Sequence, residues 1–112
     1  MTTIQTLNKV VELAEKRRDE VLGTLGQMQR ELQIAQDQMD QLQAYAQESQ
    51  ARWTARSSVG VDTALLMPHR QFMHKIDHAM EFQRGVLAER QAMIDRCQEQ
   101  VHAAERDQAG LR

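Results

Sequence analysis

The sequence is poor in the residues that build sheets, tight turns and aromatic cores. Among its 112 residues, aromatic side chains make up 4%, and proline occurs once. Glutamine, alanine, glutamate, arginine and leucine are abundant instead, and this composition favours helices and argues against a sheet. A chain of this length is enough for one small domain, so the composition predicts a single all-α domain.

Cysteine is almost absent and neither sign of charge dominates. The single Cys97 excludes an internal disulfide and fits a reducing cytosol. The formal net charge is −2, with acidic and basic side chains interspersed along the chain. Because no basic run or stripe is available to follow a phosphate backbone, we expect no nucleic-acid binding.

Long hydrophobic runs are missing as well. No apolar segment approaches the roughly 20 residues that a membrane-spanning helix needs. The segment 1–9 lacks the basic-then-apolar pattern of a signal peptide. We therefore expect a soluble protein with no direct membrane insertion, whose role at a membrane would depend on a partner.

Motifs for catalysis are also lacking. The sequence has no Gly-rich phosphate loop that ends in Lys-Ser or Lys-Thr. It also lacks the Gly-x-Ser-x-Gly spacing of a hydrolase nucleophile. We therefore expect no enzyme activity and no cofactor.

What the sequence does have is a long heptad pattern between residues 4 and 53. Steps of three and four residues alternate through it, and only Arg18 and Ser49 are polar at the selected positions. These positions are Ile4, Leu7, Val11, Ala14, Arg18, Val21, Leu25, Met28, Leu32, Ala35, Met39, Leu42, Ala46, Ser49 and Trp53. Such a pattern is the signature of a coiled-coil seam. The seam needs a partner helix, because one long helix has no core of its own.

The pattern ends after Trp53, and a turn-like segment follows. Residues 57–62 are mostly small and include a glycine, which is free to adopt a positive φ. Pro68 lacks an amide hydrogen and suits the start of a helix. The sequence therefore predicts one coiled-coil hairpin domain over residues 1–112, with a helix at 3–55, a loop at 56–67 and a helix at 68–109.

The second predicted helix has its own heptad pattern. Its a positions are Leu66, Met73, Met80, Leu87, Ile94 and Val101, and its d positions are His69, Ile76, Gln83, Arg90, Cys97 and Ala104. Folding the chain back near Val61 pairs a residues of one helix with d residues of the other, as an antiparallel hairpin requires. The predicted pairs are Trp53 with His69, Ala46 with Ile76, Leu42 with Met80, Ala35 with Leu87, Met28 with Ile94, Leu25 with Cys97 and Val21 with Val101. A slip by one heptad is the competing register.

Two arginines and the one cysteine lie in this predicted seam. Arg18 and Arg90 either carry their charges out to solvent or set the register of the two helices. Cys97 is expected to pack as a small apolar residue.

Two histidines lie outside the seam with a spacing that can bind zinc. His74 and His78 are four residues apart, and Glu81 follows three residues later. Because these heptad positions face outward, a solvated face is the favoured interpretation, and metal binding is the alternative.

One rim of the predicted hairpin is apolar. The g positions of the second helix are nearly all apolar, whereas its e positions are polar. The resulting rim strip consists of Leu42, Tyr45, Phe72, Ile76, Ala79 and Val86. Exposed strips of this kind mark partner sites. Three interpretations of the strip are open: it binds another protein, it binds a second copy of the chain, or it has no role. We favour binding to another protein.

At these residues the sequence resembles the FliJ family of flagellar export proteins. The similarity runs over Leu7, Leu13-Ala14-Glu15, Leu25-Gly26-x-Met28, Leu42-x-x-Tyr45, Gln71-Phe72 and Ala79-x-Glu81. It covers nearly the whole chain. The joint order and spacing of the motifs carry the resemblance, because each motif alone is common in coiled coils.

The resemblance implies a non-enzymatic stalk and coupling component of the flagellar type III export apparatus. Members of the family form an antiparallel coiled-coil hairpin. They bind the hexameric export ATPase, the cytoplasmic linker of the membrane export gate and some export chaperones. The implied location is cytoplasmic, with peripheral association to the inner-membrane export apparatus. The alternative is a self-associating coiled-coil scaffold or tether with no export role.

The resemblance also implies a gate-binding surface that overlaps the rim strip. Its residues are Gln38, Leu42, Tyr45, Ser49, Phe72, Ile76, Ala79 and Gln83. Two of them depart from the family's pattern. Ser49 stands where relatives have an aromatic residue, and Gln83 stands where a histidine is common.

Overall fold

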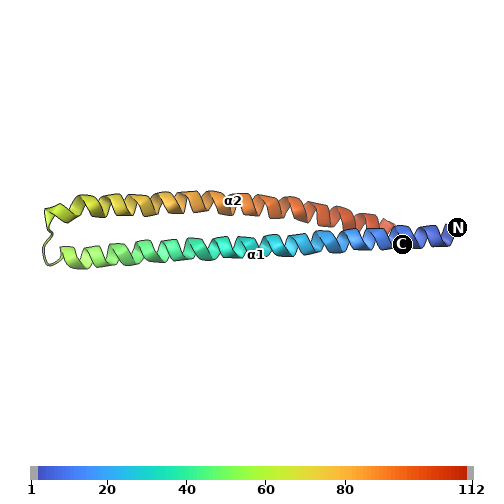
Figure 1. The fold of residues 1–112 in the computed structure, drawn as a ribbon, viewed down its shortest axis with the longest axis horizontal. Helices are drawn as coiled ribbons and strands as arrows, with labels where there is room; N and C mark the ends of the chain where they lie inside the picture. The colour runs from blue at the N-terminus through green and yellow to red at the C-terminus, as the bar shows by residue number, and fades with distance from the viewer. Residues whose placement is uncertain (1–2, 111–112) are drawn as a thin grey trace. The chain divides into compact units, whose positions relative to one another are not determined.

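Two long helices account for nearly all of the chain. The computed structural model describes residues 3–110. Helix α1 spans Thr3–Ser57, the short 3-10 helix η1 spans Thr63–Leu65, and helix α2 spans Leu66–Gly110 (Figure 1). No strand occurs within residues 3–110. The predicted all-α class with two long helices is confirmed.

Helix α1 continues two residues beyond its predicted end, to Ser57, and α2 begins two residues before its predicted start, at Leu66. At the end of α1, the Ser58 hydroxyl donates to the Ala55 carbonyl at 2.7 Å, which satisfies a carbonyl that the last turn leaves free. Pro68 is the third residue of α2 rather than the first. Its missing amide hydrogen costs nothing there, because the first turn of a helix has no internal acceptor for it.

The connection between the helices is built from local hydrogen bonds and one glycine. Gly60 has a φ of 116°, a conformation that only glycine adopts without strain. Asp62 caps η1, since its side chain accepts a hydrogen bond from the Ala64 amide at 3.0 Å. This short turn leads directly into α2.

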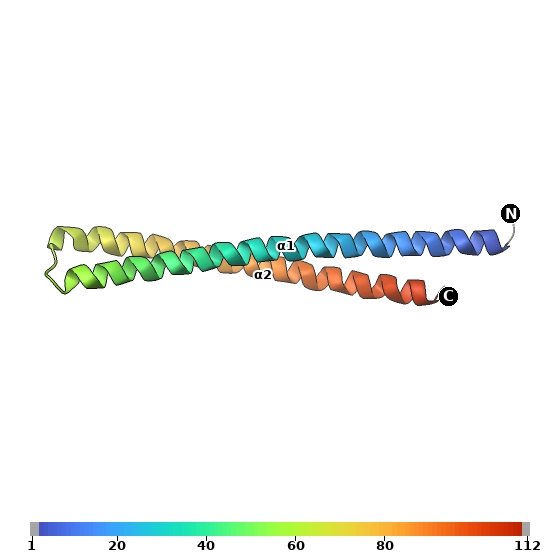
Figure 2. The ribbon, with the colours of Figure 1, turned by 90° about the horizontal axis from the view of Figure 1, so that it is seen from below.

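The chain divides into two compact units, and each is described by itself. Residues 33–88 form the loop unit, and the segments before and after them form the terminal unit. In the loop unit, the two helices lie side by side in both views (Figure 1, Figure 2). Its buried residues are Ala35, Met39, Ser49, Ile76 and Gln83. All five occupy predicted a or d positions, so the heptad assignment holds here.

Cross-helix contacts fix the direction and register of the loop unit. The rings of Trp53 and His69 stack with centroids 4.0 Å apart and planes 5° apart, as the predicted pairing requires. The Gln83 amide donates to the Ala35 carbonyl at 2.8 Å. On both helices this contact lies further from the loop than the stacked rings of Trp53 and His69. The helices are therefore antiparallel. A slip by one heptad is excluded in this unit, because it would separate Trp53 from His69.

The terminal unit is also an antiparallel pair. Its buried residues are Ile94, Cys97, Val101, Ala104 and Gln108, all on α2. The Cys97 thiol faces the Val21 carbonyl at 3.9 Å, and the predicted packing of Cys97 as a small buried residue is confirmed.

Both seam arginines reach polar groups of the opposite helix. Arg90 forms an ion pair with Glu31 at 2.9 Å. Arg18 donates to the Gln108 side-chain oxygen at 2.7 Å. Both bonds form only in this helix register, which supports a register-setting role for the two arginines. Their side chains also remain partly exposed to solvent. The Gln108 Nε2 atom is buried without a hydrogen-bond partner among the described residues.

The first seam positions of α1 are not covered. Ile4 and Leu7 are 70% and 52% exposed, although the heptad pattern places them in the seam. If Val21 lies opposite Val101, Gly110 lies nine residues beyond Val101 and is level with Glu12, nine residues before Val21. No described residue of α2 therefore lies opposite Ile4 or Leu7.

Candidate partner-binding site

The predicted gate-binding residues all lie in the loop unit, but they differ in how accessible they are. Gln38, Tyr45 and Phe72 are exposed, and Leu42 and Ala79 are half-buried. Ser49, Ile76 and Gln83 are buried between the helices. The structure therefore separates this set into surface residues that a partner can reach and interior residues that support them.

An aromatic pair across the two helices is the centre of this surface. Tyr45 of α1 and Phe72 of α2 meet edge to face, with ring centroids 5.6 Å apart and planes at 85°. They remain 46% and 38% exposed. Both precede an a residue by one position, so their backbones lie at the rim while their rings meet over the seam. An edge-to-face pair holds both rings in place and leaves their outer faces available.

Gln83 positions part of this surface from beneath. Its amide donates to the Ala35 carbonyl at 2.8 Å and to the Gln38 side-chain oxygen at 3.2 Å. The second bond holds the exposed Gln38 amide against the helix pair. The resemblance includes Gln83 in the gate-binding surface, and in the structure its side chain is buried and reaches that surface only through its bond to Gln38.

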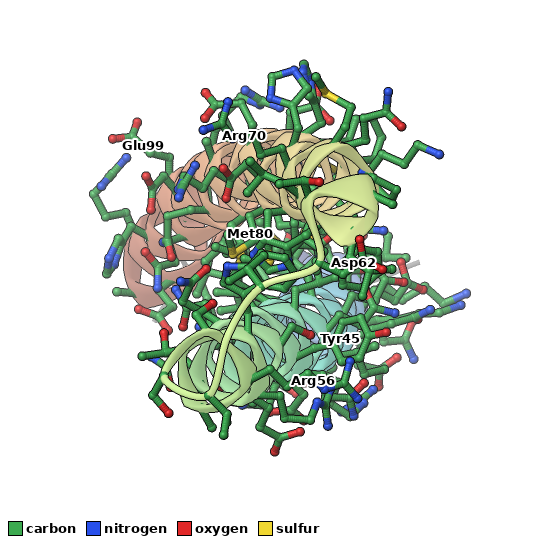
Figure 3. All side chains as sticks on the ribbon, turned by 90° about the vertical axis from the view of Figure 1, so that its left-hand side faces the viewer. Tyr45, Arg56, Asp62, Arg70, Met80 and Glu99 are labelled. Atoms are coloured by element: carbon green, nitrogen blue, oxygen red, sulfur yellow. The ribbon has the colours of Figure 1, made fainter. Side chains whose placement is uncertain are left out.

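A small cleft beside the aromatic pair adds positive charge that the sequence analysis missed. Its volume is about 150 Å³, and Tyr45, Phe72, Arg52, Arg56 and His69 are among its lining residues. Figure 3 shows Tyr45 and Arg56 on the same side of α1. The Arg52 guanidinium donates to the Ser49 hydroxyl at 3.5 Å. No carboxylate lines the cleft, so the surface can accept an aromatic or aliphatic side chain together with a negatively charged group.

A sequence signal for these arginines does exist. Arg52 occupies the g position one heptad after Tyr45, and Arg56 follows it by one turn. Arg56 also lies in the last turn of α1, where a cation interacts favourably with the helix dipole. That interaction explains the presence of Arg56 without a ligand in the cleft.

The described chain shows neither a metal centre with several ligands nor a membrane span. Within residues 3–110, no group of three or more His, Cys, Asp or Glu side chains is placed to hold one ion. Neither described helix has a stretch that is apolar enough, over sufficient length, to cross a bilayer.

The fold and the surface together define an antiparallel two-helix coiled coil with a half-exposed aromatic pair on one rim. The family model described as "Flagellar FliJ protein" matches residues 3–112, nearly the whole chain. The protein therefore belongs to the FliJ family, a family of flagellar export components, and the predicted resemblance is confirmed. No curated protein and no solved structure gives a significant match.

Proposed function

We propose that this protein is a non-enzymatic stalk and coupling subunit of the flagellar type III export apparatus. In this role it binds the hexameric export ATPase and the cytoplasmic linker of the membrane export gate. The observation that carries the proposal is the Tyr45–Phe72 pair, two aromatic rings left half-exposed on the rim of a FliJ-family coiled coil. Aromatic side chains that become fully buried on binding are the usual anchors of an interface.

The gate linker is proposed to dock on the gate-binding surface, which overlaps the rim strip. Its contact residues are Gln38, Tyr45 and Phe72, with the half-buried Leu42 and Ala79 between them. The buried residues Ser49, Ile76 and Gln83 hold this surface in shape. Two antiparallel helices present it as one preformed surface, so little conformational entropy is lost on binding.

The ATPase ring is proposed to receive the terminal unit. Ile4 and Leu7 are exposed apolar residues that continue the heptad pattern of α1. Export chaperones are a further proposed partner. The proposed location is the cytoplasmic face of the inner-membrane export apparatus, with peripheral association through these partners.

The same exposed seam residues favour one alternative, a self-associating coiled-coil scaffold. Two copies could pair through Ile4 and Leu7, because uncovered a and d positions are the contacts that coiled coils use. Light scattering after gel filtration separates the two functions, since a stalk is a monomer of 12.9 kDa and a scaffold is a stable oligomer.

The test of the proposed function is direct binding of the purified chain to each partner. We expect a complex with the export ATPase hexamer and another with the cytoplasmic linker of the export gate, both measurable by titration calorimetry. A stable oligomer that binds neither partner would reject the export role and support the scaffold.

A further inference from the structure

Helix α2 carries two histidines on an outward face, away from the rim strip. His74 and His78 occupy heptad positions b and f, whereas Phe72 and Ala79 of the strip occupy g. Residues four apart lie one turn apart on the same side of a helix. Their Nε2 atoms are 3.1 Å apart, and the ring centroids are 4.5 Å apart. The two nitrogens are therefore adjacent at an accessible surface.

The contact between these nitrogens is one that a metal ion can replace. In a hydrogen bond between two neutral imidazoles, one Nε2 donates and the other accepts. An ion bound to both Nε2 atoms takes the place of the shared hydrogen, and each ring then carries its hydrogen on Nδ1. The exchange needs one change of tautomer and small side-chain rotations.

The separation of the nitrogens fits a first-row transition metal. Bonds from zinc to imidazole are about 2.0–2.1 Å long. With the Nε2 atoms 3.1 Å apart, two such bonds meet at the ion at an angle of about 100°. This angle is intermediate between those of octahedral and tetrahedral coordination, so Zn²⁺, Ni²⁺ and Cu²⁺ all fit with little adjustment.

Two carboxylates flank the pair without completing the coordination. Asp77 and Glu81 line the same cleft of about 250 Å³ as the histidines. Glu81 is engaged by Arg84 at 2.8 Å. The carboxylates therefore contribute negative potential, which attracts a cation. Because no third ligand is in place among the described residues, water completes the coordination of a bound ion.

We propose that His74 and His78 form a two-ligand site for a divalent transition metal on the outer face of α2. The ion joins two successive turns of the helix, so it stabilises the folded chain relative to the unfolded one. The site is independent of the proposed export function, because it faces away from Tyr45 and Phe72. Of the three ions Zn²⁺, Ni²⁺ and Cu²⁺, Cu²⁺ should bind the two imidazoles most tightly, because it ranks highest in the usual order of metal affinities.

The experiment is calorimetric titration of the full chain with ZnCl₂, together with melting curves at increasing zinc concentration. We expect one ion per chain and a melting temperature that rises with zinc. His74→Ala and His78→Ala should each weaken binding at least about tenfold, which is 1.4 kcal/mol. Both positions are exposed and alanine favours helices, so both variants should keep the helical circular-dichroism signal.

Two controls separate the pair from general binding to histidines. His102→Ala removes one exposed histidine elsewhere on α2 and should leave zinc affinity unchanged. Lys75→His combined with His78→Gln keeps the number of histidines but makes them adjacent, on different faces of the helix, and should bind as weakly as His78→Ala. Wild-type affinity in His74→Ala, or an equal loss in His102→Ala, would overturn the proposal.

Discussion

A buried glutamine shows how one residue links packing to the surface. Gln83 occupies a d position, and its amide donates to Ala35 and Gln38. A polar residue in a coiled-coil seam specifies register at a cost in stability. If the Gln83 amide is removed, both acceptors keep a hydrogen bond. The Ala35 carbonyl retains its bond within the helix, and the exposed Gln38 side chain can bond to water.

Gln83→Leu should therefore raise stability by about 1 kcal/mol, because an apolar side chain of similar size replaces a buried amide. Thermal unfolding measures this change. Gln83→Ala is the control, and it should lower stability by about 2 kcal/mol through the cavity it leaves. A loss in the leucine variant as large as in the alanine variant would mean that the hydrogen bonds stabilise the fold more than burial does.

At the residue scale, periodicity predicts which side chains are buried but not what they bond to. The heptad count alone places Trp53 opposite His69 and puts Ile76 and Gln83 in the interior. The bond from Gln83 to Gln38 and the cleft formed with Arg52 depend on rotamers and on the distance between the helices. Neither quantity is encoded in the spacing of apolar residues.

At the scale of the elements, one glycine in α2 lowers the stability of the helix without a packing role. Gly85 lies inside α2, and a Cβ added there would meet no atom within 4 Å. Gly85→Ala should therefore raise stability by about 1 kcal/mol, the difference in helix propensity between the two residues. The melting temperature should rise by about 4 °C or more, as judged by circular dichroism at 222 nm. An unchanged or lower melting temperature would indicate that an unseen contact needs the glycine.

The glycine between the helices should respond in the opposite direction. Gly60 also has open space around it, but its φ of 116° is strained for any residue with a Cβ. Gly60→Ala should lower stability by about 1–2 kcal/mol, measured by urea unfolding. A neutral result would show that the connection adopts another conformation in solution.

The ends of the elements were less predictable than their existence. Pro68 suggested a helix start, yet α2 begins at Leu66, because a short 3-10 turn capped by Asp62 leads directly into it. At the other side of the loop, the Ser58 hydroxyl caps the end of α1 by donating to the Ala55 carbonyl. Such local hydrogen bonds decide the last residues of a helix, and the heptad pattern carries no information about them.

At the scale of the whole molecule, the chain should form its helix pair within one copy. Ala46 and Ile76 are a predicted seam pair, and both belong to the loop unit. Ala46→Cys with Ile76→Cys, in a chain carrying Cys97→Ser, should form a cross-link within one chain at low protein concentration. Mass spectrometry of the oxidised product measures this. Cross-links only between chains would show that two copies exchange helices.

The fold class and the partner surface follow from different kinds of information. Seven heptads of apolar residues and one break are enough to predict an antiparallel helix pair. The rim strip follows from the apolar g positions of the second helix. The identity of its partner does not follow from periodicity, because any apolar ligand of suitable shape would satisfy an exposed pair such as Tyr45 and Phe72.

The central claim is that this aromatic pair is a binding surface rather than part of the core. Tyr45→Ala with Phe72→Ala should lose only about 1 kcal/mol of stability for each ring, because half-exposed side chains contribute part of their burial energy. The matched control is Phe82→Ala, which removes a 75% exposed ring elsewhere on α2.

The measurement that tests this claim most directly is the affinity of the double variant for the cytoplasmic linker of the export gate. Anchors that become fully desolvated are worth 2 kcal/mol or more, so the affinity should fall at least about thirtyfold. Binding to the export ATPase should change little, and Phe82→Ala should bind both partners as the wild type does. A folded double variant that binds the gate linker at full strength would contradict the account.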